Sequence, residues 1–309
     1  MYIVAIDLGG TNIAAAVLDE KFNILLKDST PTLLNRPYEE IADDIGKLIL
    51  SLISKAGISA DEVLRIGIGA PGIPNNQTGL ISDNANFHWQ NFPLRAHIQK
   101  FLNKPVYMAN DANAAALAEF TLGSGKGSNN FLMLTLGTGV GGGIVIDKKL
   151  YVGSRFIAGE IGHYPLKAGG RKCGCGSEGC IEQYCSATAL VKRASELLAE
   201  YPDSTLNKAQ KITAKSVVDA ARENDALGKK VFDEYVCDLG YTLAGLVNMF
   251  DPDVIALGGG VAGAGEFLLE PLRKFFITKT IHSTLVDTKI VCAQMGNDAG
   301  IIGAALLDQ

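Results

Sequence analysis

Two segments of the sequence follow the same plan of strand, glycine-rich turn, second strand and charged turn. The first is DLGGTNIAAAVLDEK at residues 7–21, and the second is TLGTGVGGGIVIDKK at residues 135–149. Aligned without a gap, Leu8, Gly9, Val17 and Asp19 match Leu136, Gly137, Val145 and Asp147. Because a solenoid needs three or more copies of its repeat, a single duplication of this kind predicts two related lobes.

The length and the order of elements agree with two lobes. The chain has 309 residues, roughly twice the common domain size. Strand patterns alternate with helical patterns, which predicts an α/β fold with largely buried sheets. We expect a smaller N-terminal lobe at residues 1–115 and a larger C-terminal lobe at 116–296, with a cleft between them. A last helix, at about 297–309, is expected to pack back on the first lobe.

Composition limits the classes of partner. The net charge of -5 argues against nucleic acid, because phosphate backbones bind to basic surfaces. The N-terminal MYIVAIDLGG lacks the basic segment and cleavage site of a signal peptide. No apolar run reaches the length of about 18 residues that a membrane span needs. We therefore expect a cytoplasmic protein without a membrane partner, whose thiols stay reduced.

The first glycine turn suits a phosphate group. In GGTN the backbone N–H groups and the Thr11 hydroxyl have no bulky side chain in front of them. Asp7, at the end of the entering strand, can hold Mg²⁺, directly or through water. A plain tight hairpin in which Asp7 bonds the turn is the alternative. The matching turn GTGVGGG at 137–143 favours the phosphate interpretation.

Three other glycine segments need separate interpretations. Residues 137, 139 and 142 match GxGxxG, but that dinucleotide fingerprint opens a helix, whereas GIVID continues as a strand. GSGKG at 123–127 lacks the P-loop spacing and is predicted to be a surface turn. LGGGVAGAGEF at 257–267 can pack the base and ribose of a nucleotide against backbone, or it is an ordinary strand-to-helix turn. The candidate nucleotide residues are Asp7, Gly9, Gly10, Thr11, Asn12, Gly137, Thr138, Gly139, Gly259 and Gly260.

Three carboxylates are candidates for sugar chemistry. Asp111 stands where a strand ends and a helix begins, a position typical of an N-cap. Beside a phosphate donor, the same position suits a general base that accepts the proton of a sugar hydroxyl. Glu160 and Glu182 flank the cysteine cluster and can each accept hydrogen bonds from sugar hydroxyls; solvation at the surface is the alternative.

The cysteine cluster has the composition of a zinc site. His163 precedes Cys173, Cys175 and Cys180, which together form the Cys₃His set of a closed tetrahedral site. The order differs from the usual paired CxxC arrangement. Free thiols or a disulfide are therefore the alternatives. Such a zinc ion would be structural and would cross-link a loop with few apolar residues, which places Glu160 and Glu182 beside a ligand.

The sequence resembles the ROK family (repressor, open reading frame, kinase) of sugar kinases, within the actin and hexokinase superfamily. DLGGT, GAPG, NDANAAALAE, GTGVGGG, GEIGH, CGCGSEGCIE and LGGGV occur in the order of the family and cover almost the whole chain. The resemblance implies two lobes of the ribonuclease H-like, actin-like ATPase fold with a cleft between them.

The resemblance also implies an activity and a set of site residues. The activity is an ATP- and Mg²⁺-dependent transfer of the γ-phosphoryl group to the 6-hydroxyl of a hexose, as in a glucokinase. Asp111 would be the catalytic base, and Thr11, Gly139 and Gly260 would lie along the ATP. The sugar contacts would be Gly72, Asn86, Asn110, Asp111, Glu160, His163 and Glu182, and the zinc ligands would be His163, Cys173, Cys175 and Cys180.

The family leaves several alternatives open. Kinases of N-acetylmannosamine, fructose and allose share nearly every motif, and a few relatives use phosphoryl donors other than ATP. Sugar-responsive repressors of the family carry a helix-turn-helix before the first strand, whereas here only Met1 precedes YIVAIDL. The family often forms dimers or tetramers, so we expect a homodimer or homotetramer. Cys185, Cys237 and Cys292 have no predicted function.

Overall fold

The computed structural model of the protein describes residues 1–34, 36–84 and 89–308. Its contacts divide the chain into two compact units. Unit 1 is Met1–Thr121, Leu150–Ala158 and Asn297–Gln309, and unit 2 is Leu122–Lys149 and Gly159–Gly296. Residues 150–158 thus group with unit 1, and residue 115 lies within helix α3 (Asp111–Leu122). The cleft between two lobes stays a prediction.

Unit 1 is built on a mixed five-stranded sheet of order β3-β2-β1-β4-β8. Its strands are β1 (Tyr2–Leu8), β2 (Asn12–Asp19), β3 (Ile24–Pro31), β4 (Val63–Ala70) and β8 (Val106–Asn110). The first three strands pair antiparallel, and β1, β4 and β8 pair parallel. The inner strands are continuous apolar runs because helices cover both faces, whereas the edge strand β3 alternates in exposure.

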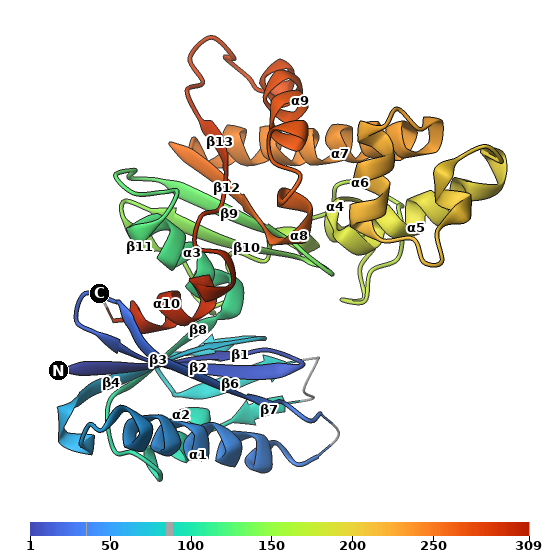
Figure 1. The fold of residues 1–309 in the computed structure, drawn as a ribbon. Coiled ribbons are helices and arrows are strands. Elements are labelled where there is room, and N and C mark those ends of the chain that lie inside the picture. Colours follow the sequence, from blue (N-terminus) through green and yellow to red (C-terminus); the bar gives the residue numbers. More distant parts are fainter. Residues whose placement is uncertain (35, 85–88, 309) are drawn as a thin grey trace. The chain divides into compact units, whose positions relative to one another are not determined.

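Helices cover the two faces of this sheet (Figure 1). On one face lie α1 (Tyr38–Ala56), whose apolar residues repeat at helical spacing as predicted, and α2 (Leu94–Gln99). Helix α1 ends at Gly57, whose φ of 66° suits glycine. On the other face lie α3 and α10 (Ala299–Ala305). A small antiparallel sheet adds β5 (Pro74–Asn75), β6 (Leu80–Asn84) and β7 (Trp89–Phe92).

A second five-stranded sheet, of order β11-β10-β9-β12-β13, belongs to unit 2 apart from Leu150, the last residue of β11. Its strands are β9 (Phe131–Leu136), β10 (Val140–Ile146), β11 (Lys149–Leu150), β12 (Val254–Gly258) and β13 (Lys289–Cys292). Strands β9 and β10 form an antiparallel hairpin, and β9, β12 and β13 pair parallel. In strand order and direction, β9, β10, β12 and β13 therefore correspond to β1, β2, β4 and β8 of unit 1. The duplication inferred from the two glycine turns is therefore confirmed in the topology, and the predicted α/β class is confirmed in both units.

The helices of unit 2 pack around one long helix, α7 (Ala226–Phe250), which contacts α5 (Ala187–Leu197), α6 (Ala214–Arg222) and α9 (Glu266–Phe276) (Figure 1). Cys185 is fully buried in this core, and its carbonyl accepts a hydrogen bond of 2.7 Å from the Tyr235 hydroxyl. It is therefore a packing residue.

The remaining helices of the two units are short. They are α4 (Glu182–Cys185), α8 (Gly259–Ala262) and the 3-10 turns Ala60–Glu62, Ile161–His163, Leu198–Glu200, Thr205–Lys208, Ile277–Lys279 and Gly296–Asp298.

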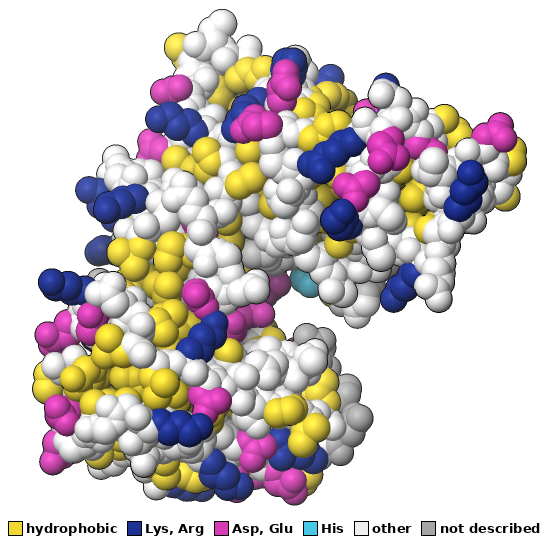
Figure 2. Space-filling model, in the orientation of Figure 1, with side chains coloured by type: hydrophobic (Ala, Val, Ile, Leu, Met, Phe, Trp, Pro, Cys, Tyr) yellow, Lys and Arg dark blue, Asp and Glu magenta, His cyan; other side chains and the backbone are white. Residues whose placement is uncertain are grey.

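Two surface observations bear on the partner classes. On the face shown in Figure 2, Lys and Arg side chains are interspersed with Asp and Glu, so the described residues of that face form no continuous basic surface. Within the described part of the chain, no helix is both long enough and apolar enough to cross a bilayer.

Candidate active site

The hairpin between β1 and β2 is closed by its backbone and by one threonine. The Gly9 N–H donates to the Asn12 carbonyl at 3.0 Å, and the Thr32 hydroxyl donates to the Gly9 carbonyl at 2.6 Å. Among the described residues, Asp7 makes none of the bonds that close the turn. Gly10, Thr11 and Asn12 are exposed, so the tip of the hairpin is open to a ligand. The described residues therefore do not show a hairpin closed by Asp7, and phosphate binding at this turn stays a prediction.

Asp7 lies in a crowded position at the end of β1. A Cβ atom on Gly300 of α10 would come within 2.5 Å of Asp7 Oδ2, so helix α10 packs directly against this carboxylate. Burial, reinforced by the negative charge of Asp111, raises the pKa of Asp7 to about 6, and the positive charge of Lys27 opposes the rise. Because the carboxylates of Asp7 and Asp111 repel each other, a divalent cation bound between or beside them would relieve that repulsion.

Asp111 is the first residue of α3, and its neighbour Asn110 caps the helix. Asn110 Oδ1 accepts from the N–H of Ala112 at 2.9 Å and from that of Asn113 at 3.4 Å, the two donors that an N-cap normally satisfies. The Asp111 carboxylate also accepts from the Ala112 N–H at 2.9 Å. Burial raises the pKa of Asp111, and this hydrogen bond opposes the rise. The cap explanation therefore belongs to Asn110.

Two further sugar candidates belong to unit 1. Gly72, with φ of 90°, follows β4, and its carbonyl accepts from Asn110 Nδ2 at 3.2 Å. Gly72 and Asn110 therefore lie together beside Asp111. Asn86 lies outside the described residues.

The second glycine hairpin lies beside the first residue of α8, the helix that directly follows β12. The Gly137 N–H donates to the Gly139 carbonyl at 3.0 Å, and Thr138 at the tip is exposed. A Cβ atom on Gly259, whose φ is 80°, would come within 2.6 Å of the Leu136 carbonyl oxygen. The exposed Gly259 and Gly260 therefore stand next to the end of β9. Unit 2 thus brings together the nucleotide candidates of both its glycine segments.

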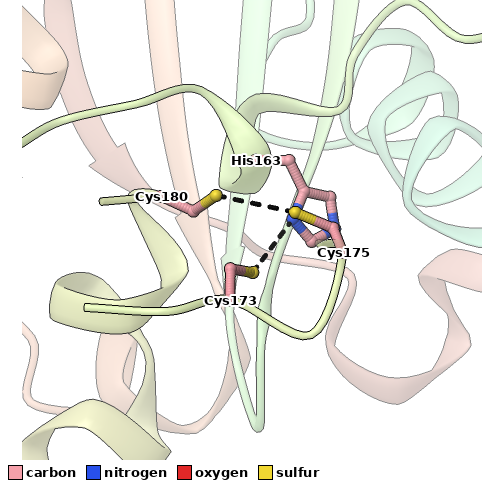
Figure 3. Close-up of side chains that lie close together, drawn as sticks. All are labelled: His163, Cys173, Cys175 and Cys180. Atoms are coloured by element: carbon pink, nitrogen blue, oxygen red, sulfur yellow. Dashed lines mark hydrogen bonds between the residues drawn. The ribbon is translucent and has the colours of Figure 1, made fainter. Parts of the chain in front are cut away.

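The four predicted metal ligands converge in unit 2 (Figure 3). One donor atom from each of His163, Cys173, Cys175 and Cys180 lies within 4.8 Å of the other three. The distance from Cys173 Sγ to His163 Nδ1 is 3.6 Å, and that from Cys175 Sγ to Cys180 Sγ is 3.7 Å. Zn–S bonds are about 2.3 Å long and Zn–N bonds about 2.05 Å. At tetrahedral angles these lengths place a sulfur about 3.6 Å from the nitrogen and about 3.8 Å from another sulfur. The residues present therefore fit a zinc ion.

The loop that carries these thiols depends on glycine. The Cys173 N–H donates to the Ser177 carbonyl at 2.8 Å, and the Gly176 N–H returns to the Cys173 carbonyl at 3.1 Å. Gly176 has φ of 91°, and a Cβ atom on Gly179 would come within 1.8 Å of the Lys167 carbonyl oxygen. The glycines of CGCGSEGC therefore allow the tight turns that aim the thiols at one point.

Glu182 joins the cysteine cluster to the second hairpin. It is the first residue of α4, and its Oε1 accepts from Cys173 Sγ at 3.1 Å and lies 4.0 Å from His163 Nδ1. Its other oxygen, Oε2, lies 2.6 Å from the point where a Cβ atom on Gly139 would stand. The exposed Glu160 directly precedes the 3-10 turn that ends at His163. Unit 2 therefore brings Glu160, His163 and Glu182 into one neighbourhood.

Sequence reasoning missed two residues of the unit 1 site. The positive charge of Lys27 in β3 opposes the rise in the pKa of Asp7. Gly300 of α10 packs against the Asp7 carboxylate. The signal for Gly300 is the small-residue spacing in DAGIIGAALL. Gly303, one turn later, comes so close to α3 that a Cβ atom would stand 1.7 Å from the Ala114 carbonyl oxygen.

Comparisons with known proteins agree with these motifs. The model of the ROK family matches residues 3–309. The chain is 37% identical over 311 residues to a glucokinase of Halalkalibacterium halodurans, covering 99% of this chain and 94% of the relative. It is 34% identical to a glucokinase of Thermotoga maritima, covering 98% and 96%.

A solved structure extends the similarity to three dimensions. The ROK family glucokinase of Streptomyces griseus, in complex with glucose and AMPPNP, is 35% identical, with a TM-score of 0.81 and coverage of 99% of this chain and 98% of that one. The family match, the duplicated sheets and the motifs have a common explanation. The chain belongs to the ROK family.

Proposed function

We propose that this protein is an ATP-dependent hexose kinase that transfers the γ-phosphoryl group to the 6-hydroxyl of glucose. The observation that carries the proposal is the position of Asp111, a partly buried carboxylate at the start of α3 whose neighbour supplies the helix cap. The similarity to glucokinases over nearly the whole chain supports the choice of glucose.

In the proposed reaction, Asp111 accepts the proton of the 6-hydroxyl as the oxygen attacks the γ-phosphorus. A raised pKa makes its carboxylate a stronger base than an exposed aspartate, provided that the working pH lies above that pKa. The bond from the γ-phosphorus to the bridging oxygen of ADP breaks, and the products are glucose 6-phosphate and ADP. The phosphate oxygens accept hydrogen bonds from backbone N–H groups of the hairpins at Gly9–Asn12 and Gly137–Gly139.

Asp7 is the proposed residue for Mg²⁺, directly or through water. When bound, Mg²⁺ would neutralise the negative charge of the phosphates. Gly259 and Gly260, exposed beside β9, are proposed to pack against the nucleotide's base and ribose.

The sugar is proposed to be held by Asn110, Gly72, Glu160, His163 and Glu182, together with Asn86. Asn110 has a defined capacity for this role. One of its two amide N–H groups donates to the Gly72 carbonyl, which leaves the second for a sugar hydroxyl. Each glutamate can accept two hydroxyl donors.

The Cys₃His cluster is proposed to hold a structural zinc ion, since four protein ligands leave no position for substrate. Its role is to fix the loop that carries His163 and precedes Glu182. Thiolate ligands fit a reducing cytoplasm, which is the proposed location. A homodimer or homotetramer is proposed from the family alone.

The test is a measurement of ADP release by the purified protein with Mg²⁺, ATP and a panel of hexoses and N-acetylhexosamines. The proposal predicts glucose as the substrate with the highest kcat/KM. A preference for N-acetylmannosamine, fructose or allose would correct the substrate, and no turnover with any sugar would contradict the kinase assignment.

A further inference from the structure

Gly139 and Glu182 meet without a side chain between them. A Cβ atom on Gly139 would stand 2.6 Å from Glu182 Oε2 and 3.8 Å from its carboxyl carbon. The Glu182 carboxylate therefore occupies the space that any other residue at position 139 would fill. Both residues belong to unit 2, one in the glycine hairpin and one at the start of α4.

The backbone of Gly139 does not itself demand glycine. Its φ lies outside the left-handed range in which L side chains are strained, in contrast to Gly259 with φ of 80°. The Glu182 carboxylate, and not the backbone conformation, therefore restricts position 139 to glycine.

The elements on both sides hold this contact in place. The Ala187 N–H donates to the Gly137 carbonyl at 2.8 Å, which ties the hairpin to the segment that follows α4. The Tyr235 hydroxyl bonds the Cys185 carbonyl at the end of α4. The other carboxylate oxygen, Oε1, lies 3.1 Å from Cys173 Sγ. Only the Glu182 side chain can give way if position 139 gains an atom.

We propose that Gly139 is a positioning residue for the sugar: its missing side chain seats the carboxylate of Glu182. Ordinary contact begins at 3.4 Å, so an alanine would displace Oε2 by about 0.8 Å. A displacement of that size at a group that orients substrate reduces catalysis by about tenfold to a hundredfold. The inference rests on the proposed function, in which Glu182 binds the sugar, and gives Gly139 a role apart from the nucleotide phosphates.

Gly137 provides the matched control in the same hairpin. A Cβ atom there meets no atom within 4 Å, and its φ also lies outside the strained range. Gly137→Ala therefore adds the same methyl group to the same turn without touching Glu182. If both glycines served only the phosphates, both alanines would leave sugar binding alone.

The experiment measures the Kd of glucose and of AMPPNP separately by calorimetry, for the wild type, Gly139→Ala, Gly137→Ala and Glu182→Asp, and for Gly139→Ala combined with Glu182→Asp. We expect Gly139→Ala to raise the glucose Kd by about tenfold, which corresponds to the loss of about one hydrogen bond to a charged group, while the AMPPNP Kd stays unchanged. Gly137→Ala should leave the glucose Kd unchanged. In the Glu182→Asp background, where the shorter side chain removes the clash, Gly139→Ala should add no further loss.

The inference is overturned if Gly139→Ala weakens AMPPNP but not glucose, or if its effect is the same with and without Glu182→Asp. A wild type that binds no glucose contradicts the proposed function instead. In that case thermal unfolding still tests the contact. Any drop in Tm caused by Gly139→Ala should disappear in the Glu182→Asp background, and no drop, or a drop that persists there, contradicts the steric relation.

Discussion

The side chain of Asn110 caps helix α3 through the N–H groups of Ala112 and Asn113, and the carboxylate of its neighbour Asp111 shares the Ala112 N–H. Asn110 is the last residue of β8, and its side chain joins this strand to two other segments: Oδ1 bonds helix α3, and Nδ2 bonds the Gly72 carbonyl after β4. A helix start of this kind holds the Asp111 carboxylate in a fixed direction. Asn110 therefore has two roles that a substitution can separate: it caps α3, and it is proposed to bind the sugar.

Asn110→Ser should separate folding from sugar binding. Serine caps a helix about as well as asparagine but cannot donate to the Gly72 carbonyl, so the free energy of unfolding should fall only by about 0.5–1.5 kcal/mol, the contribution of that one hydrogen bond. Serine lacks the amide N–H groups, so the KM for glucose should rise by about tenfold, which corresponds to one lost hydrogen bond to the sugar. Asn110→Ala is the control and should lose about 1 kcal/mol of stability beyond the loss in the serine variant, because it also lacks the cap. Unchanged glucose KM in the serine variant would remove Asn110 from the sugar site.

Asp7 should destabilise the protein when it is charged. Because the pKa of Asp7 is raised from 3.8 to about 6, the folded state binds the proton more tightly than the unfolded chain. Its contribution therefore lowers stability as the pH rises from about 4 to about 6, by at most about 3 kcal/mol. In Mg²⁺-free buffer, Asp7→Asn should be more stable than the wild type at about pH 7.5, and the difference should shrink toward about pH 4.5.

Urea unfolding at the two pH values measures this difference, with the exposed Asp61→Asn as the control. Asp7→Asn should also lose most of its kinase activity. An Asp7→Asn protein that is less stable than the wild type at both pH values would show that the carboxylate is satisfied in the fold.

Cys175→Ser should remove the metal and loosen the sugar site. Cys175 is the exposed ligand of the cluster, and the other two thiols are buried. We expect about one zinc ion per chain in the wild type and in Cys237→Ser, and much less in Cys175→Ser. Loss of the cross-link should lower Tm and raise the KM for glucose more than that for ATP. Elemental analysis with thermal unfolding tests this, and a zinc-free wild type with full glucose affinity would contradict it.

Gly303→Ala and Gly245→Ala should change stability in opposite directions. Both glycines lie within helices, but a Cβ atom on Gly303 would stand 1.7 Å from the Ala114 carbonyl oxygen, whereas one on Gly245 meets nothing within 4 Å. We expect Gly303→Ala to destabilise by about 2–3 kcal/mol through overpacking. Gly245→Ala should stabilise by about 0.5–1 kcal/mol through helix propensity. Denaturant unfolding compares them, and equal effects would mean that α10 is not packed tightly on α3.

Local patterns were sufficient to predict much of the fold. The apolar spacing of α1, the duplicated glycine hairpins and the convergence of His163 with three cysteines each follow from residues close together in the sequence. The identity of the helix cap was not predictable, because Asn110 and Asp111 are both good caps and only the backbone geometry decides between them.

The contacts of Gly300 with Asp7 and of Gly139 with Glu182 were also beyond the sequence. They join segments far apart in the chain, and a glycine carries no sign of which neighbour fills its empty side. The grouping of residues 150–158 with unit 1 could not be predicted either, because no change in composition marks that segment.

Asp111 is proposed to accept a proton from a glucose hydroxyl during phosphoryl transfer from ATP. The most direct measurement is glucose 6-phosphate formation by the wild type and by Asp111→Asn at saturating substrates, together with the glucose Kd of each protein. We predict that kcat falls by about a hundredfold to ten-thousandfold in Asp111→Asn while the glucose Kd stays close to that of the wild type. Near-normal turnover in Asp111→Asn would contradict the account.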